Sequence, residues 1–156
     1  MNQQKAFKIF NYLKSIDNNF FLAGSARRGK TEELHDLDVI YVGEKTPNIP
    51  NYAAFVKGKD ITRVMIQDEQ VDIYRTDPEY FGGMLLFLTG PQEFNIIVRS
   101  KAKKKGMVLN QKGLFNRETR EPIATKTEEE IFAALGLKYK EPENRGAWFK
   151  PKSKNA

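Results

Sequence analysis

Three aspartates in this chain have the residue type and spacing expected of a metal-dependent phosphoryl-transfer site. Asp36 and Asp38 stand two positions apart in a segment of branched apolar residues, so in a strand both carboxylates face one side, roughly 6.6 Å apart along the backbone. Asp72 is flanked by Val71 and Ile73 in a second apolar segment. Oxygen ligands beside phosphates favour magnesium. If the two strands are neighbours, the carboxylates can hold two ions that stabilise the attacking and leaving oxygens of an in-line displacement.

A second motif overlaps this region and predicts different chemistry. Residues 24–31 match the phosphate-loop pattern Gly-x4-Gly-Lys followed by Ser or Thr, and they follow an apolar run, as a nucleotide-hydrolysing enzyme requires. Only residues 32–35 then precede the next strand, about one helical turn, whereas a phosphate loop continues into a full helix. We therefore keep the phosphate-loop NTPase as an alternative and expect Lys30 and Thr31 to be exposed loop residues.

The hydrophobic periodicity indicates which elements position these residues. It predicts helices over 3–15, 80–88, 92–105 and 127–135, strands over 20–23, 36–42, 61–66 and 71–74, a hairpin turn at 67–70 and an irregular strand over 107–115. The helix over 127–135 opens with a capping box formed by Thr127 and Glu130. The first half is thus expected to be a sheet with at least one covering helix, and the second half to be largely helical.

Composition excludes several classes of protein. The 156 residues contain no cysteine and one histidine, which excludes a disulfide scaffold, a thiolate zinc site and a cysteine nucleophile. No apolar run approaches the ~20 residues that span a bilayer, and no secretory signal is recognised. The net charge of +6 lies wholly in the second half, because residues 1–78 carry 11 basic and 11 acidic side chains and the rest carry 15 and 9. This asymmetry favours a polyanionic partner, with a solvated lysine-rich surface as the alternative.

The ordered motifs resemble those of the nucleotidyltransferases, and among them the family X DNA polymerases related to DNA polymerase beta. The matching residues are Gly24-Ser25, Arg27-Arg28-Gly29, Asp36, Asp38, Val71-Asp72-Ile73, Phe87-Leu88-Thr89-Gly90, Phe94-Asn95, Arg99, Gly136-Leu137-Lys138-Tyr139, Glu141-Pro142 and Arg145. The similarity covers about residues 3–145. It implies an α+β fold, with a nucleotidyltransferase palm of mixed β-sheet and helices at 1–78. A small basic α+β lobe for the nascent base pair and DNA would follow at 79–149, and a basic tail at 150–156.

The resemblance also implies roles for individual residues. The three aspartates would be catalytic and would bind two Mg²⁺ ions, for which Mn²⁺ could substitute. The implied nucleotide-binding residues are Gly24, Ser25, Arg28, Phe87, Leu88, Gly90 and Asn95, and the implied DNA-binding residues are Arg99, Lys103 and Lys104. Ser25 and Arg28 would bind the β- and γ-phosphates, while Phe87 and Leu88 would pack against the incoming sugar. Without the resemblance, Phe87 and Leu88 are predicted to be core residues, and Ser25 an ordinary helix cap.

The function implied is a DNA-directed DNA polymerase of repair that adds a deoxynucleotide to a primer 3′-hydroxyl. Its partners would be gapped or primer–template DNA and a dNTP, and it would not bind a membrane. It would act as a monomer in the cytoplasm, nucleus or nucleoid, and it could be encoded by a cell or by a virus. The alternatives are a template-independent or RNA-acting nucleotidyltransferase, a non-catalytic DNA-binding module and the phosphate-loop NTPase. Gln70 departs from the family pattern, which usually has arginine two positions before the third carboxylate.

Overall fold

A computed structural model describes residues 1–29 and 33–149, and it divides the chain into two compact units. Unit 1 is Met1–Pro78 and unit 2 is Glu79–Ala156. Each unit has a hydrophobic core of its own. Within the described ranges, no helix is both long and apolar enough to cross a bilayer. The predicted basic tail at 150–156 lies outside the described residues.

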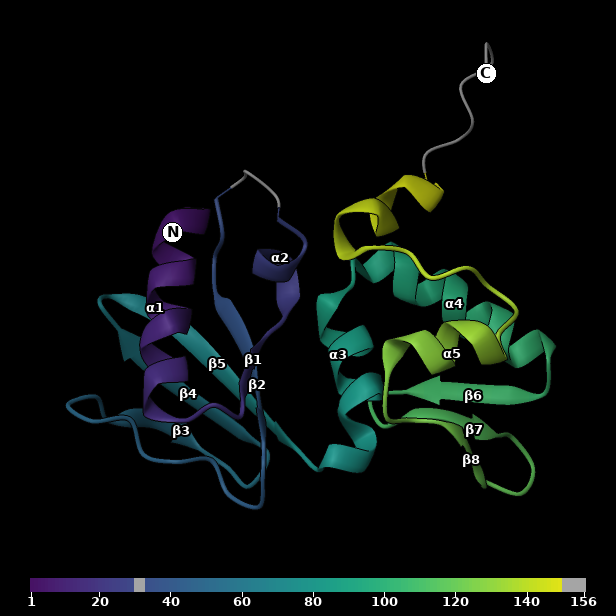
Figure 1. Cartoon of the computed structure of the whole chain (residues 1–156), viewed down its shortest axis with the longest axis horizontal. Helices are drawn as coiled ribbons and strands as arrows, with labels where there is room; N and C mark the ends of the chain where they lie inside the picture. The colour runs from purple at the N-terminus through teal and green to yellow at the C-terminus, as the bar shows by residue number, and fades with distance from the viewer. Residues whose placement is uncertain (30–32, 150–156) are drawn as a thin grey trace, which may run out of the picture. The chain divides into compact units, whose positions relative to one another are not determined.

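Unit 1 is a five-stranded mixed sheet with a helix along it (Figure 1). Its elements are α1 (Gln3–Ile16), β1 (Phe20–Leu22), α2 (Gly24–Arg27), β2 (Leu37–Val42), β3 (Ala54–Lys57), β4 (Ile61–Ile66) and β5 (Glu69–Thr76). The strand order is β1-β2-β5-β4-β3. Strands β2 and β5 are parallel, and the other neighbouring pairs are antiparallel. The mixed α+β prediction is confirmed, whereas β3 and α2 were not expected.

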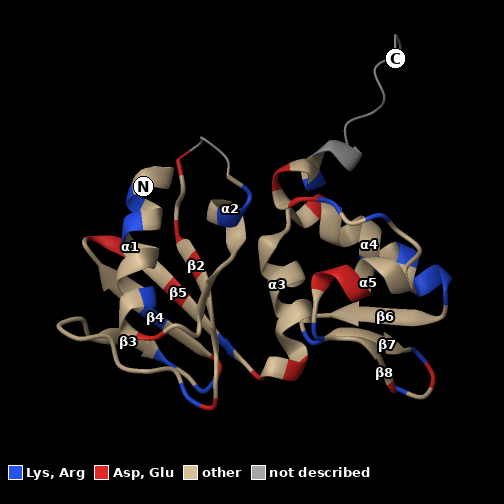
Figure 2. Cartoon of the chain, viewed as in Figure 1, with Lys and Arg blue, Asp and Glu red and all other residues tan. Residues whose placement is uncertain are grey.

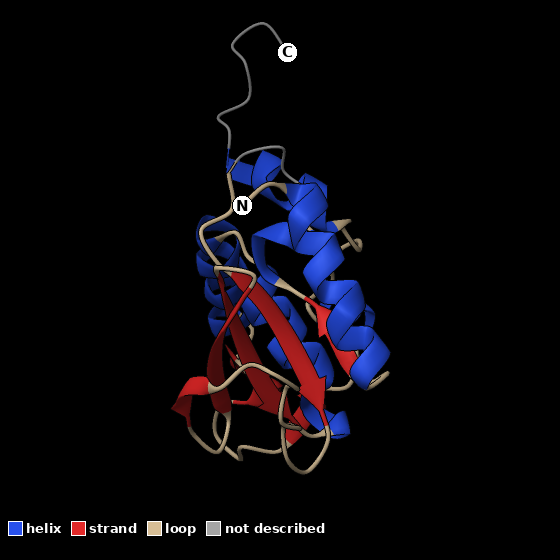
Figure 3. Cartoon of the chain, turned by 90° about the vertical axis from the view of Figure 1, so that its left-hand side faces the viewer, coloured by secondary structure: helices blue, strands red, loops and turns tan. Residues whose placement is uncertain are grey.

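Helix α1 lies alongside the strands of unit 1 (Figure 3). Asn2 caps its start by accepting a hydrogen bond from the Lys5 backbone N–H at 2.8 Å. Ala6, Ile9 and Leu13, spaced three or four residues apart, are fully buried in the core of the unit. Burial of each large aliphatic side chain contributes about 1.5–3 kcal/mol, so this apolar stripe fixes which face of the helix meets the sheet.

Strands β4 and β5 form the predicted hairpin, but the turn is shorter than expected. Only Gln67 and Asp68 lie between the strands, both with positive φ, 51° and 65°. Two-residue hairpin turns favour this backbone because it matches the twist of the strands. Strand β5 therefore already begins at Glu69, and Gln70 joins Asp72 on one side of the strand.

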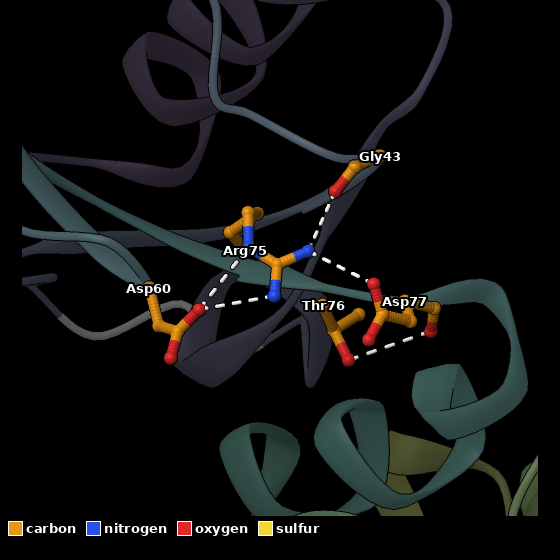
Figure 4. Close-up of polar contacts among 5 residues, drawn as sticks. All are labelled: Gly43, Asp60, Arg75, Thr76 and Asp77. Atoms are coloured by element: carbon orange, nitrogen blue, oxygen red, sulfur yellow. Dashed lines mark hydrogen bonds and ion pairs between the residues drawn. The ribbon is translucent and has the colours of Figure 1, made fainter.

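The far end of β5 is held by a buried arginine (Figure 4). The Arg75 guanidinium donates to the Asp60 carboxylate from Nε and Nη2 at 3.1 and 3.0 Å, to the Gly43 carbonyl at 2.7 Å and to Asp77 Oδ1 at 3.1 Å. The side chain is only 10% exposed. Charge-assisted hydrogen bonds of this kind are strong, so they fix the last residues of the strand that carries Asp72.

Unit 2 contains a three-stranded antiparallel sheet and three α-helices among its described residues. The elements are η1 (Pro78–Tyr80), α3 (Phe81–Thr89), α4 (Gln92–Lys104), β6 (Met107–Asn110), β7 (Gly113–Asn116), β8 (Pro122–Ala124), α5 (Glu128–Ala134) and η2 (Pro142–Phe149). The strand order is β6-β7-β8. Figure 2 shows the acidic first turn of α5 and the basic last turn of α4. The predicted capping box of α5 is confirmed, since Thr127 Oγ1 accepts from the Glu130 N–H at 3.1 Å.

The expectation of one irregular strand over 107–115 is wrong, because this segment is the β6–β7 hairpin. The two-residue turn has no Asn-Gly or Asp-Gly pair to reveal it. Instead, Asn110 Oδ1 accepts from the Lys112 N–H at 2.8 Å, and Gly113 takes a φ of 126°. The turn packs against α3 so closely that a Cβ atom at Gly83 would lie 2.2 Å from the Gly113 nitrogen. Only glycine permits that approach.

A buried ion pair connects α5 to the C-terminal part of unit 2. Arg145 and Glu128 are joined by two hydrogen bonds of 2.8 and 3.0 Å, and neither side chain is exposed. The guanidinium carbon lies 5.3–5.6 Å from the ring centroids of Phe94, Phe132 and Tyr139. Because a buried charge without its partner is strongly destabilising, the pair fixes the position of η2 within the unit.

Candidate active site

Asp38 and Asp72 lie side by side on the parallel strands β2 and β5. They are Cα partners in the strand register, so their side chains leave the same face, and neighbouring strands are about 4.8 Å apart. Asp36 immediately precedes β2, two residues before Asp38. Asp72 is 5% exposed, whereas Asp36 and Asp38 are half-buried. The third carboxylate is therefore next to the Asp-x-Asp pair on one side of the sheet.

The surroundings of Asp38 oppose its negative charge. Burial is the largest cause that raises the pKa of this carboxyl to about 7, followed by the negative charges of Asp72 and Asp36. Arg28 and Arg63 act in the opposite direction without cancelling the effect. A group of carboxylates that repel one another in a partly desolvated place is stabilised by a bound cation.

One hydrogen bond and one ion pair hold Asp72 through the same oxygen. Gln70 Nε2 donates to Asp72 Oδ1 at 2.9 Å, and Arg63 Nε lies 3.4 Å from that oxygen as an ion pair. Arg63 comes from β4, directly opposite Asp72 in the antiparallel register. Arg63 is not among the residues that the sequence predicted for this site. The signal was available, because a hairpin centred on Gln67 and Asp68 pairs position 63 with position 72.

The glycine-serine motif approaches the carboxylates through α2. Gly24 has a φ of 65°, and a Cβ atom there would lie 2.6 Å from Asp38 Oδ2. The following residues, Ser25 and Arg28, are half-buried, and the charge of Arg28 acts on Asp38. The structure thus brings these three predicted nucleotide-binding residues to the aspartates. Lys30 and Thr31 of the phosphate-loop pattern lie outside the described residues, and α2 ends before them, at Arg27.

The donor set suits a divalent ion that is completed by a substrate. Within the described part of the chain, no three acidic or histidine side chains are gathered closely enough to hold a metal ion alone. Mg²⁺ is commonly bound by one or two carboxylates together with substrate phosphates, and all three aspartates offer hard oxygen ligands. The geometry therefore fits ions that bind together with a polyphosphate.

Unit 2 contains the remaining predicted site residues. Phe87 is 44% exposed at the end of α3 and Leu88 is half-buried, so the alternative that Phe87 is a core residue is wrong. Asn95 Nδ2 donates to the Phe87 carbonyl at 2.9 Å, which joins α4 to the end of α3. Phe87, Asn95 and Arg99 line a common pocket. Gly90 ends α3 with a φ of 61°.

Comparisons with known proteins identify the family to which this arrangement belongs. Residues 84–146 match the family model described as DNA polymerase beta thumb. The chain is 31% identical over 166 residues to the "Repair DNA polymerase X" of an African swine fever virus isolate, and the alignment covers 88% of this chain and 95% of that protein. The chain belongs to DNA polymerase family X.

A further relative agrees with this assignment, and a solved structure shares the fold. The family X chain is 31% identical over 138 residues to the "DNA polymerase/3'-5' exonuclease PolX" of Bacillus subtilis, which covers 81% of this chain and 24% of that protein. Its fold matches a Leishmania infantum polymerase beta ternary P/T complex with a TM-score of 0.75 and 21% identity, covering 93% and 76% of the two chains. The family X resemblance and the enzyme class, nucleotidyltransferase, are confirmed, and the phosphate-loop NTPase is excluded.

Proposed function

We propose that this family X polymerase fills short gaps in DNA during repair, adding dNMP units to a primer 3′-hydroxyl under template direction with two Mg²⁺ ions. The single observation that carries the proposal is the register of β2 and β5, which places Asp72 beside Asp38 with Asp36 two residues away. Relatives named repair DNA polymerase X support the repair context. The Leishmania infantum polymerase beta structures are ternary P/T and gap complexes, which supports primer–template and gapped DNA as partners.

The residues of unit 1 would prepare the reacting groups. Asp36 and Asp38 would ligate both metal ions. Asp72 would ligate the catalytic ion and help to take the proton of the 3′-hydroxyl. The primer oxygen then bonds to the α-phosphorus, and the bond to the departing pyrophosphate breaks. Ser25 and Arg28 bind the β- and γ-phosphates by hydrogen bonding and charge. When bound, the two ions, for which Mn²⁺ can substitute, would neutralise charge that develops on the attacking and leaving oxygens.

The orientation of Asp72 matters for this role. Gln70 donates to Oδ1, and the closest approach of Arg63 is to the same oxygen. The two side chains would thus orient the carboxylate for its role. In the family pattern, an arginine stands at the position of Gln70. In this chain Arg63, from the neighbouring strand, would instead supply the cation beside the Asp72 carboxylate.

The proposed domain roles follow from the two sets of residues. Residues 1–78 act as the palm and 79–149 as the lobe that binds the nascent base pair and DNA. Phe87 and Leu88 meet the incoming sugar at the helix end marked by Gly90. Asn95 meets the base pair, and Arg99, Lys103 and Lys104 contact DNA. We further propose a monomer acting in the cytoplasm, nucleus or nucleoid. The viral relatives support a virus-encoded origin.

Primer extension on DNA with a one-nucleotide gap tests the proposal. Wild type with Mg²⁺ is expected to add the nucleotide complementary to the template, and Asp72→Asn to abolish extension while retaining DNA affinity. Asp68→Asn is the matched control, because it makes the same change in the same hairpin at an exposed position whose backbone asparagine tolerates.

Other results of this experiment would contradict the role of Asp72 or indicate a different function for the protein. Extension by Asp72→Asn would contradict the assigned role. Extension by wild type without regard to the template, or on RNA alone, would indicate the other nucleotidyltransferase class. DNA binding by wild type with no extension would indicate a non-catalytic module.

A further inference from the structure

A groove in unit 2 is lined by four cationic side chains from two separate segments. Arg99 and Lys103 lie on α4, and Arg117 and Arg120 lie in the turn between β7 and β8. The volume of the groove is about 340 Å³. The rest of its lining comes from the apolar residues 107–109, and none of the described acidic side chains takes part. Arg117 and Arg120 have no role in the polymerase site described above.

The four cations are available to a ligand. All are exposed, and no ion pair joins any of them to an acid within the described residues. Arg99 and Lys103 are four residues apart on one helix, about 6 Å along its axis, a spacing that suits consecutive phosphates of one strand. Unpaired like charges that share a groove favour a polyanion, because they repel one another when it is absent.

The turn that carries Arg117 and Arg120 is internally ordered. Asn116 Oδ1 accepts from the backbone N–H groups of Glu118 and Thr119 at 2.9 and 3.0 Å, and the Asn116 carbonyl accepts from Arg120 at 2.9 Å. Neither Glu118 nor the neighbouring Glu121 lines the groove. Since these hydrogen bonds already fix the backbone, less conformational entropy is lost when the two arginines bind a ligand.

The position of Arg99 indicates which strand would occupy the groove. Arg99 and Leu109 line this groove and also the pocket that contains Phe87 and Asn95, so the two sites adjoin. In the proposed function that pocket takes the nascent base pair. On a primer–template, the primer ends at the nascent base pair and only the template strand continues beyond it. A basic groove that begins there and leads to the β7–β8 turn has the chemistry to receive the continuing strand.

We propose that the groove formed by Arg99, Lys103, Arg117 and Arg120 binds phosphates of the single-stranded template beyond the nascent base pair. The inference rests on the proposed polymerase function, because it requires a template. No aromatic side chain lines the groove on which a base could stack, so its binding is independent of sequence. Its contribution decreases as salt increases, since phosphate contacts release counterions.

The test compares Arg117→Gln/Arg120→Gln with Lys126→Gln/Lys138→Gln. Both double variants remove two exposed positive charges from unit 2, but Lys126 and Lys138 lie outside the groove. Fluorescence anisotropy measures the affinity for a primer–template with a long 5′ template overhang and for the same duplex without it. We expect the arginine variant to lose about tenfold in affinity for the overhang substrate only. Its log–log salt slope should fall by about 1.4, because each single-strand phosphate contact contributes about 0.7. The lysine variant should match wild type.

Equal loss of affinity on both substrates, or no loss on the overhang substrate, would overturn the groove assignment. Extension by the arginine variant at saturating DNA should equal that of wild type, which separates this inference from the polymerase function. If wild type failed to extend a primer, the proposed function would be wrong, and the overhang-dependent binding would still decide whether the groove holds single-stranded DNA.

Discussion

Replacement of Asp38 by asparagine is expected to stabilise the metal-free protein while it removes activity. The side chain keeps its shape, but it no longer introduces a charge beside Asp72 and Asp36. Burial and these neighbours raise the pKa of Asp38 from 3.8 to about 7 in the folded protein. Each pKa unit corresponds to about 1.36 kcal/mol, so full ionisation in the fold would cost about 4 kcal/mol. Solvent screening of the half-buried group reduces this, and we expect a gain of about 1–3 kcal/mol.

The sign of the pH dependence follows from proton linkage. Below about pH 4 the carboxyl is protonated in both the folded and the unfolded wild type, so the Asp38→Asn variant gains nothing. Between about pH 4 and pH 7 the unfolded chain ionises while the folded protein retains its proton, so the stability of wild type falls as pH rises. Above about pH 7 the loss is complete and the advantage of the variant is constant.

Urea unfolding in the presence of a chelator measures this directly. The free energy of unfolding is compared for wild type, Asp38→Asn and the exposed control Asp68→Asn across the pH range. The gain should appear only for Asp38→Asn, increase with pH and level off near neutrality. A variant less stable than wild type at high pH, or a gain of equal size at all pH values, would refute the claim that the carboxylates repel one another in a desolvated place.

Three further predictions test single contacts. Gly24→Ala should reduce extension by at least about tenfold, because the added methyl group would displace the Asp38 carboxylate. Circular dichroism should show that the fold is intact. Full activity would contradict the close approach of Gly24 to Asp38. In steady-state extension, Arg63→Gln should change kcat by a larger factor than the KM for dNTP, with kcat reduced, because the Arg63 cation orients the third carboxylate. Arg63→Lys should restore part of the lost kcat. A change in KM alone would argue against this orienting role. Glu128→Gln should lower the free energy of unfolding by about 3–5 kcal/mol in urea titrations, because it leaves Arg145 buried without its charge partner; a neutral effect would show that water reaches the pair.

The local pattern of the sequence determined the parts of this protein that depend on neighbours along the chain. The apolar stripe of α1, the β4–β5 hairpin and the capping box of Thr127 and Glu130 were all predicted, because each arises within one helix or one turn. The spacing of Asp36 and Asp38 predicted that the two carboxylates lie close together, and the charge of Asp36 does act on Asp38, although β2 begins only at Leu37. The alternation of side chains along a strand predicts which face of the sheet each side chain occupies. It does not predict which strand lies beside that strand.

Tertiary structure alone decided which of these residues meet. The parallel pairing of β2 with β5 places Asp72 beside Asp38, across a segment that contains two further strands, and no local periodicity records that pairing. Likewise, Gly24 meets Asp38 only after the chain has folded. These contacts join residues distant in sequence, and their energy comes from burial and charge that exist only in the packed molecule.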